Sequence, residues 1–354
     1  MNFRHLDYVI AQFFDVSTSP VFKVLSQGHI NDTICFSAIG KEYILQKINR
    51  DVFRTPEVLM QNMVTVAEYL QRNSDLPHIL FPLFNKQGVC YAQDLEGAFW
   101  RVLPYIPNSY APDVVTTIDQ AEAAANMLGR FLAALKGLNT SRIQDTITGF
   151  HNSINRYAVF DQVVGRSSLD LRKKAGKSIL AIRQYYPLFK EIQELSLPKW
   201  VVHNDPKISN VLFDQTSHEA LCMIDWDTIM VGSILTDFGD MVRTACSSAS
   251  EEEKDLDKIS LRPDFFEACC KGFLPAVQHL LTEVEQNRLL DGVKWIVLEQ
   301  TMRFLTDFLD DNHYYKTSYP DQNLFRANNQ LALYRSILAQ EQELHQIIQQ
   351  NLVT

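Results

Sequence analysis

The sequence lacks the features that mark secreted, membrane-spanning and nucleic-acid-binding proteins. Its N-terminus has no basic segment followed by an unbroken apolar run and a small-residue cleavage site, so no signal peptide is predicted. No run of about 18 apolar residues occurs, which argues against a transmembrane helix. Lys and Arg number 33 against 42 Asp and Glu, a net charge of −9, and no basic stripe is available for nucleic-acid phosphates. We therefore expect a cytoplasmic protein without a membrane or nucleic-acid partner.

Cysteine is also scarce, and the few cysteines are not arranged for pairing. No C-x-x-C pair occurs, and the adjacent Cys269 and Cys270 cannot easily bridge each other. Neither a disulfide framework nor a cysteine-based zinc site is expected. We predict that all six thiols are reduced: Cys35, Cys90, Cys222, Cys246, Cys269 and Cys270.

The first hundred residues of the 354 read mainly as short strands around one helix. Thr55-Pro56-Glu57 has the order of a helix start, and an apolar residue recurs at helical spacing after it, from Leu59 to Leu70. The β-branched and aromatic runs around this helix predict strands. These runs are Val21–Leu25, Asp32–Ala38, Tyr43–Ile48, Ile79–Phe84, Val89–Tyr91 and Ala98–Val102.

The remaining residues read mainly as helices around a small β island. Helical apolar spacing is found at 121–135, 169–185, 264–281, 284–309 and 328–351. The island comprises Trp200–Val202, Asn210–Phe213 and Ala220–Ile224. Between the two regions, Leu103–Ser109 contains two prolines, which favour an extended hinge. We predict an α+β fold with a strand-rich N-lobe at 1–103, a hinge at 104–109 and a helical C-lobe at 110–354.

A polar loop within the β island carries the strongest chemical signal. It reads His203-Asn204-Asp205-Pro206-Lys207-Ile208-Ser209-Asn210, and its Asp and Asn are five apart, as in the catalytic loop of kinases. In such a loop the Asp accepts the proton of the acceptor hydroxyl, and the Asn gives magnesium an oxygen ligand. We predict Asp205 as the catalytic base and Asn210 as a metal ligand. His203 is expected to brace the loop by hydrogen bonds.

A second acidic motif follows on the next predicted strand. Asp225 ends the apolar run Met223-Ile224, where kinases carry a metal-binding Asp, although Trp-Asp stands here in place of Phe-Gly. If the strand continues, Asp225 and Asp227 project to the same side and both are predicted metal ligands. Further on, Asp237, Asp240 and Arg243 are expected to form a helix start and a supporting ion-pair network beneath the loop. The run Ser250–Asp255 is expected to be a capped, solvated helix start.

These motifs resemble the aminoglycoside phosphotransferase and choline kinase family, most closely its bacterial N-acetylhexosamine 1-kinases. The resemblance extends from about Gly28 to Arg326. It includes His203–Asn210 and Ile224–Asp227, and the further stretches Gly28–Asn31, Tyr43–Gln46, Asp227–Met230, Asp237–Asp240, Met302–Leu305 and Tyr319-Pro320. It implies a protein-kinase-like fold that uses Mg²⁺ and ATP, works as a monomer or weak dimer, and phosphorylates the anomeric hydroxyl of GlcNAc or GalNAc.

The resemblance also implies further site residues. His29, Arg303 and Tyr314 would contact the hexosamine, together with Asp205. Arg303 falls within an otherwise apolar helix, so it needs either a ligand or an internal partner such as Asp307, four residues on. The nucleotide would lie in the cleft, against Gly28, Gln46, Pro104, Tyr105 and Ile106.

One expected kinase residue is missing from the sequence. The lysine that grips the phosphates should follow Tyr43-Ile44-Leu45, where the sequence has Gln46. Lys47 points to the opposite side of a regular strand, so it can replace that lysine only if a bulge shifts the register. The helix Glu that pairs with such a lysine is undecided between Glu57 and Glu68.

Two alternatives stay open at the sequence level. The acidic composition suits a cationic acceptor such as choline, ethanolamine or another amino alcohol, whereas Arg303 opposes one. Gln46 in place of lysine would permit a non-catalytic nucleotide-binding pseudokinase, which the intact Asp205, Asn210 and Asp225 oppose.

Overall fold

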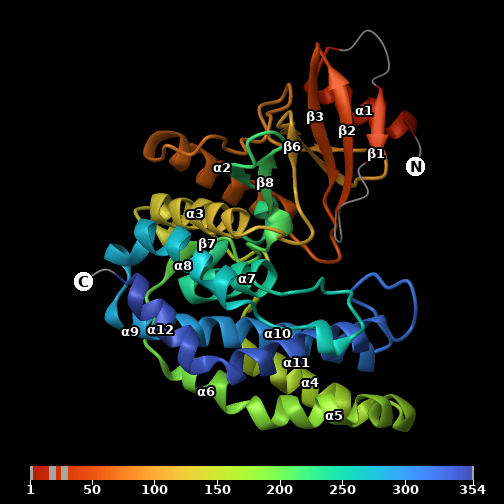
Figure 1. Cartoon of the computed structure of the whole chain (residues 1–354). Coiled ribbons are helices and arrows are strands. Elements are labelled where there is room, and N and C mark those ends of the chain that lie inside the picture. Colours follow the sequence, from red (N-terminus) through yellow and green to blue (C-terminus); the bar gives the residue numbers. More distant parts are fainter. Residues whose placement is uncertain (1–2, 16–20, 25–30, 353–354) are drawn as a thin grey trace.

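The computed structural model describes residues 3–15, 21–24 and 31–352. Figure 1 shows a strand-rich region, which holds the N-terminus, above a larger helical region, which holds the C-terminus. Within the described residues, none of the helices combines the length and the apolar character needed to cross a membrane.

The N-terminal region is built on an antiparallel sheet of five strands in the order β1-β2-β3-β5-β4. Its strands are β1 (Phe22–Val24), β2 (Asp32–Ala38), β3 (Lys41–Lys47), β4 (Ala92–Gln93) and β5 (Phe99–Pro104). Side chains alternate between the two faces along each strand, so the sheet packs on both sides. Trp100 and Val102 of β5 pack with Leu6 and Val9 of α1 (Phe3–Phe13).

The opposite face of the sheet packs against α2 (Pro56–Asn73). Pro56 occupies the first turn, where its missing N–H is not needed, and Glu57 lies at the positive end of the helix. The buried face of α2 joins Phe99 and Leu103 of β5 in one apolar cluster, and it consists mainly of Leu59, Met63, Val66 and Leu70. The predicted helix and its inward face are confirmed.

The helical region contains most of the remaining elements. Its helices are α3 (Ile118–Leu135), α4 (Ser153–Arg166), α5 (Leu169–Tyr185), α6 (Pro187–Glu194), α7 (Ile234–Ala245), α8 (Pro263–Val277), α9 (Glu283–Asn287), α10 (Leu289–Leu309), α11 (Gln322–Ala339) and α12 (Glu341–Asn351). Short 3-10 turns lie at Thr140–Arg142, Ile208–Asn210, Trp226–Thr228, Leu256–Lys258 and Gln278–Leu280.

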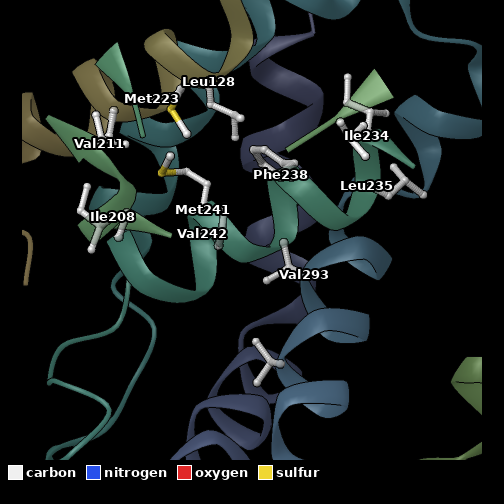
Figure 2. Packing of buried hydrophobic residues seen from close by; sticks show 14 of the residues in the cluster. Leu128, Ile208, Val211, Met223, Ile234, Leu235, Phe238, Met241, Val242 and Val293 are labelled. Atoms are coloured by element: carbon white, nitrogen blue, oxygen red, sulfur yellow. The ribbon is translucent and has the colours of Figure 1, made fainter. Parts of the chain in front are cut away.

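Helix α7 is at the centre of this region and is almost entirely buried. Figure 2 shows Met241 and Val242 near Ile208, Val211 and Met223, while Val293 of α10 lies below the helix. Gly239 and Gly292 allow the close approach of α7 and α10, because a Cβ at Gly239 would lie 2.4 Å from the Gly292 carbonyl oxygen. The core therefore fixes α7 against the segment that carries the polar loop.

The β island is formed by two small antiparallel sheets. In one, β7 (Trp200–Val202) pairs with β10 (Met230–Gly232). In the other, β8 (Val211–Asp214) lies between β9 (Ala220–Met223) and β6 (Ser109–Tyr110). Through β6, the segment that follows β5 is attached to the helical region.

Several sequence predictions of elements are wrong in detail. Ile79–Phe84 is irregular, and Pro82 has no N–H with which to continue a ladder. The short β4 replaces the strand expected at Val89–Tyr91. The helices expected at 284–309 and 328–351 are each two helices, broken at Arg288 and Gln340. Helices α1, α4 and α6 were not predicted, and the helix start expected near Asp237 lies within α7.

The acidic run Ser250–Asp255 is not the solvated helix start that was predicted. Glu251 forms an ion pair with Arg243 at 2.6 Å, and Glu252 accepts a hydrogen bond from Arg326 at 2.6 Å. Both arginines are buried. Their charges require carboxylate partners, which explains why this segment folds back against α7 and α11.

The prediction of reduced cysteines is confirmed. All six are free and buried. Cys246 and Cys269 approach each other, with their sulfur atoms 3.6 Å apart, but they are not bonded.

Candidate active site

Helix α7 holds the polar loop by its backbone. The Asp237 carboxylate accepts hydrogen bonds from the amide of His203 at 2.7 Å and from that of Asn204 at 2.8 Å. Asn204 has a φ of 65°, a conformation that a non-glycine residue keeps only where its surroundings stabilise it. Asp240 binds Arg243 at 2.7 Å. The predicted supporting network beneath the loop is confirmed.

His203 braces the loop from inside, as predicted. Its side chain is completely buried, and its Nε2 lies 2.8 Å from the Ile224 carbonyl oxygen, to which it donates. Burial lowers the pKa of His203, although Asp205 opposes this shift. A neutral, buried ring is suited to support rather than to proton transfer with a substrate.

Asp205 is partly exposed at the head of the loop. Its Oδ2 accepts hydrogen bonds from Lys207 Nζ at 2.9 Å and from Asn210 Nδ2 at 3.1 Å. Burial opposes ionisation, but Lys207, with smaller contributions from His203 and Arg243, lowers the pKa of Asp205. The group is therefore an ionised carboxylate that can orient a hydroxyl and accept its proton. Sequence reasoning gave Lys207 no role, although it lies within the recognised loop.

Asn210 and Asp225 bring two further oxygen donors close to this carboxylate. The Asn210 Nδ2 donates to the backbone and side chain of Asp205, which leaves the amide oxygen free for a cation. Asp225 is partly exposed, and its pKa is raised to about 7 by burial and by Asp227. Among the described residues no three His, Cys, Asp or Glu side chains converge on one metal position. Two oxygen donors fit magnesium, which usually takes one or two protein ligands and completes its shell with water and phosphate.

Asp227 is placed differently from Asp225. Strand β9 ends at Met223 and Asp225 has a φ of 61°, so the strand does not continue and the expected alternation is wrong. Asp227 is buried, with one oxygen paired to Arg101 and the other accepting from Asn31 Nδ2 at 2.6 Å. Both oxygens are therefore engaged within the protein.

Gln46 lies on β3 and faces α2. It donates to the Thr33 hydroxyl at 3.1 Å and accepts from Arg101 Nε at 2.9 Å. The register from Tyr43 to Lys47 is continuous against both neighbouring strands, so no bulge turns Lys47 to this face. Lys47 instead lies over the Trp100 ring at 5.9 Å on the opposite side of the sheet.

The other predicted nucleotide contacts lie in the hinge or outside the described residues. Pro104 is the last residue of β5 and pairs with Tyr43, and Tyr105 is partly exposed. Ile106 is buried, and its carbonyl accepts from the Ser109 hydroxyl at 2.6 Å. Gly28 and His29 lie outside the described residues.

Arg303 has no carboxylate partner among the described residues. Its guanidinium donates to Gln300 at 3.0 Å and lies near the Phe150 and Tyr315 rings, at 5.3 and 5.6 Å. The internal partner considered from the sequence, Asp307, instead accepts from the amides of Tyr314 and Tyr315. Asp307 thus fixes the backbone of the aromatic loop that contains Tyr314. Tyr314 is 49% exposed, so its side chain can contact a ligand.

Three further residues near Arg303 were not predicted from the sequence: Glu299, His151 and Arg156. The buried Glu299 binds His151 Nδ1 at 2.8 Å and lies 3.5 Å from Arg156 Nε. His151 Nε2 lies 3.1 Å from the Asn204 carbonyl oxygen of the catalytic loop. Arg156 also donates to the Phe150 carbonyl at 2.6 Å. Glu299 is 148 residues from His151, and His151 is 53 residues from Asn204. These residues belong to no short motif, so nothing in the sequence could identify them.

The arrangement combines an ionised carboxylate, two oxygen donors suited to a cation, and a cluster of charged and aromatic side chains around Arg303. Burial opposes the charge of Arg303, but Tyr315, Tyr314, Glu299 and Asp205 together raise its pKa. A carboxylate beside two oxygen donors can deprotonate a hydroxyl next to a metal-bound phosphate. The geometry is that of a phosphoryl-transfer site.

Comparison with known proteins agrees with this geometry. A sequence model described as "Phosphotransferase enzyme family" (APH) matches residues 21–263. The chain is similar to the microcompartment-associated aminopropanol kinase with a TM-score of 0.67, at 14% identity over 95% of this chain and 97% of that one. For spectinomycin phosphotransferase APH(9)-Ia in complex with ADP and spectinomycin, the TM-score is 0.62 at 12% identity, with 97% and 99% covered.

A third similar structure is the Plasmodium vivax ethanolamine kinase, with a TM-score of 0.56 at 11% identity over 90% of this chain and 83% of that one. At such identities the likeness establishes the fold. It confirms the predicted kinase-like architecture, an antiparallel N-terminal sheet followed by a mainly helical region.

Proposed function

Because the chain belongs to the phosphotransferase enzyme family and is thus an ATP-dependent small-molecule kinase, we propose that its acceptor is the anomeric hydroxyl of an N-acetylhexosamine such as GlcNAc or GalNAc. The sequence resemblance to N-acetylhexosamine 1-kinases supports this acceptor. The products would be the sugar 1-phosphate and ADP.

In this proposal Asp205 is the catalytic base. Its carboxylate, ionised beside Lys207, orients the acceptor hydroxyl in line with the γ-phosphate and takes its proton as the oxygen–phosphorus bond forms. Asn210 and Asp225 would hold magnesium, which neutralises phosphate charge when bound. Asp227 was predicted with them, but its engagement by Arg101 and Asn31 favours a supporting role.

The nucleotide is assigned to the cleft between the lobes. We propose an N-lobe at 1–103 and a C-lobe at 110–354, joined by a hinge at 104–109 whose Pro104, Tyr105 and Ile106 contact the nucleotide. Gly28 and Gln46 would lie on the phosphate side, and His29 and Tyr314 beside the sugar. The protein would act as a monomer or weak dimer.

The observation that carries the acceptor assignment is Arg303. It is a guanidinium without a carboxylate partner among the described residues, and both Asp205 and Glu299 act on its charge. Arg156 lies near enough that its own pKa is lowered, first by burial and then by Arg303. Arg303 acts on the base and would repel an ammonium acceptor, whereas its guanidinium can donate hydrogen bonds to an N-acetyl carbonyl and to sugar hydroxyls.

The test is phosphate transfer from Mg·ATP to GlcNAc, GalNAc, glucose, galactose, choline and ethanolamine, followed by phosphorus NMR. We expect sugar 1-phosphate from the N-acetylated sugars and no transfer to the amino alcohols. Asp205→Asn should lower kcat by about 10²–10⁴-fold. Transfer to choline or ethanolamine alone would refute the acceptor but keep the kinase, and nucleotide binding without any product would indicate a pseudokinase.

A matched pair of arginine variants tests the role of Arg303. Arg303→Met should raise KM for GlcNAc by about tenfold or more, because a charged hydrogen bond of roughly 1.5–3 kcal/mol is lost. Arg166→Met removes an exposed arginine, paired with Asp310 at 2.6 Å, and should leave KM unchanged. Equal KM values for the two variants would contradict the assignment of Arg303.

A further inference from the structure

The strand position that carries a phosphate-binding lysine in kinases is occupied by Gln46, and the neighbouring strand places a different cation there. Gln46 of β3 pairs in register with Arg101 of β5, so the two side chains lie on the same face of the sheet. Arg101 Nε donates to Gln46 Oε1 at 2.9 Å. Lys47 is on the other face, beside Trp100.

Arg101 joins three elements of the site. Its Nη1 forms an ion pair with Asp227, which stands two residues after the proposed metal ligand Asp225. The same nitrogen lies 3.9 Å from Met63 Sδ on α2. Asp227 is held from a second direction by Asn31, whose Oδ1 accepts from the Asn49 amide at 3.0 Å. The N-terminal sheet and the metal-binding segment are thus connected through this one carboxylate.

One nitrogen of the Arg101 guanidinium has no acceptor among the described residues. Arg101 is fully buried, and its Nη2 has no hydrogen-bond partner among the described residues. A buried, charged N–H without an acceptor is unfavourable, and such groups in folded proteins usually have a partner. Arg101 also acts on the charge of Asp225, so the guanidinium lies close to the proposed metal ligand as well as to Asp227.

We propose that Arg101 supplies the cation that β3 lacks: it positions Asp227, and with it the metal-binding segment, and its Nη2 donates to a phosphate oxygen of the bound nucleotide. This inference rests on the proposed kinase function but not on the identity of the acceptor. It assigns to an Arg–Asp pair between β5 and the segment after β9 the task that a lysine on β3 has in other kinases. Arg101 is in this sense a positioning residue that also contacts the nucleotide.

The test compares binding of Mg·ADP with binding of adenosine, which has no phosphates, by calorimetry in the absence of acceptor. Arg101→Lys keeps a cation beside Asp227 but removes the second terminal nitrogen. We expect it to weaken Mg·ADP binding by about tenfold or more while adenosine binding stays within about twofold. If Arg101 had only a structural role, its substitution would weaken the binding of both ligands equally or the binding of neither.

A second variant excludes misfolding as the cause. Arg101→Met alone would leave the Asp227 charge buried without a partner, so it is combined with Asp227→Asn, which removes both charges and keeps the shapes. This double variant should show the same selective loss of Mg·ADP. The matched control, Arg130→Met with Asp75→Asn, removes an Arg–Asp pair of 2.9 Å remote from the cleft and should bind both ligands like the wild type.

Restoring the lost Mg·ADP affinity with a second substitution provides an independent test. Gln46→Lys in the Arg101→Met background returns a lysine to β3 on the same face and should recover part of the Mg·ADP affinity. Wild-type Mg·ADP affinity in a folded double variant, or equal loss for Mg·ADP and adenosine, would overturn the proposal. If no N-acetylated sugar is phosphorylated, the proposed acceptor is wrong but the role of Arg101 stands. If the wild type binds neither Mg·ADP nor adenosine, both the kinase function and the role of Arg101 are overturned.

Discussion

Glu299 shows how a single buried charge supports the catalytic loop. It is 1% exposed in α10, and its oxygens bind His151 and the Ser153 hydroxyl. Burial alone would raise its pKa, but His151, Arg156 and Ser153 together lower it from 4.5 to about 2. Because His151 also contacts the Asn204 carbonyl, the charge of Glu299 helps to fix the segment that precedes Asp205.

We therefore predict that Glu299→Gln destabilises the protein in a pH-dependent way. A carboxylate with a depressed pKa in the folded state contributes stability above its unfolded pKa and loses it as the pH falls toward its folded pKa. The variant should lose about 3 kcal/mol of unfolding free energy near neutral pH. That difference should narrow by more than about 1 kcal/mol between about pH 6 and pH 3.5 in urea titrations.

The control for this prediction is Glu267→Gln, which removes an exposed carboxylate from an ion pair of 2.7 Å with Lys271. An exposed pair of this kind contributes less than about 1 kcal/mol. A pH-independent loss in Glu299→Gln, or a loss no larger than that of the control, would contradict the role given to Glu299.

The residues of the site differ in how far the sequence could predict them. The kinase-like spacing of Asp205, Asn210 and Asp225 identifies them because they belong to adjoining loops with a fixed order. Arg101 and Asp227 are 126 residues apart, and their contact depends on the packing of two lobes. No local spacing encodes such a pair, and Asp227 was assigned to the metal because its backbone was expected to continue as a strand.

At the scale of elements, the packing of α7 on α10 decides where the catalytic loop lies. A Cβ at Gly239 would lie 2.4 Å from the Gly292 carbonyl oxygen, and one at Gly292 would lie 2.4 Å from that of Leu235. Gly239→Ala must therefore move the two helices apart. Overpacking of this kind costs about 1–3 kcal/mol. Because Asp237 on α7 holds the His203 and Asn204 amides, we also expect kcat to fall.

Gly176→Ala is the matched control for this prediction. Gly176 lies inside α5, and no atom lies within 4 Å of the position of an added Cβ. Alanine there should stabilise the protein by about 0.5–1 kcal/mol, because it restricts the unfolded chain and favours the helix. The unfolding temperature should thus rise in Gly176→Ala and fall in Gly239→Ala, and kcat should fall only in Gly239→Ala. Equal behaviour of the two variants would contradict the close-packing argument.

Elements with a clear period were predicted well, and those set by tertiary contacts were not. Helix α5 has the predicted bounds, and α2 has its predicted inward face. Ile79–Phe84 has strand-like composition but contains Pro82, and only Leu83 donates to β5, at 2.9 Å. The continuous helix expected at 284–309 is interrupted at Arg288, and the spacing of apolar residues does not predict this interruption. Residues 250–255 do not form the predicted helix start, because their carboxylates pair with the distant Arg243 and Arg326.

At the scale of the molecule, side-chain contacts fasten α2 and the N-terminal sheet to the helical region. Asn62 of α2 donates to the Gln144 carbonyl at 2.7 Å and to that of Ile229 at 3.2 Å, and accepts from the Gln144 amide at 3.1 Å. The Arg101–Asp227 pair is a second link between the two regions. Helix α2 is therefore attached to the helical region as firmly as to its own sheet.

Asn62→Ala should loosen this attachment. It leaves the Gln144 amide and two carbonyl groups without partners, so we expect the unfolding free energy to fall by about 1–3 kcal/mol and amide exchange at Gln144 to accelerate. Gln61→Ala changes the exposed face of the same helix, where Gln61 bonds only Thr65 among the described residues, and should alter neither quantity. KM for ATP should rise in Asn62→Ala alone, because the cleft would then need to be ordered when the nucleotide binds. An unchanged Gln144 exchange rate would show that the lobes are held together by the Arg101–Asp227 pair and the hinge without Asn62.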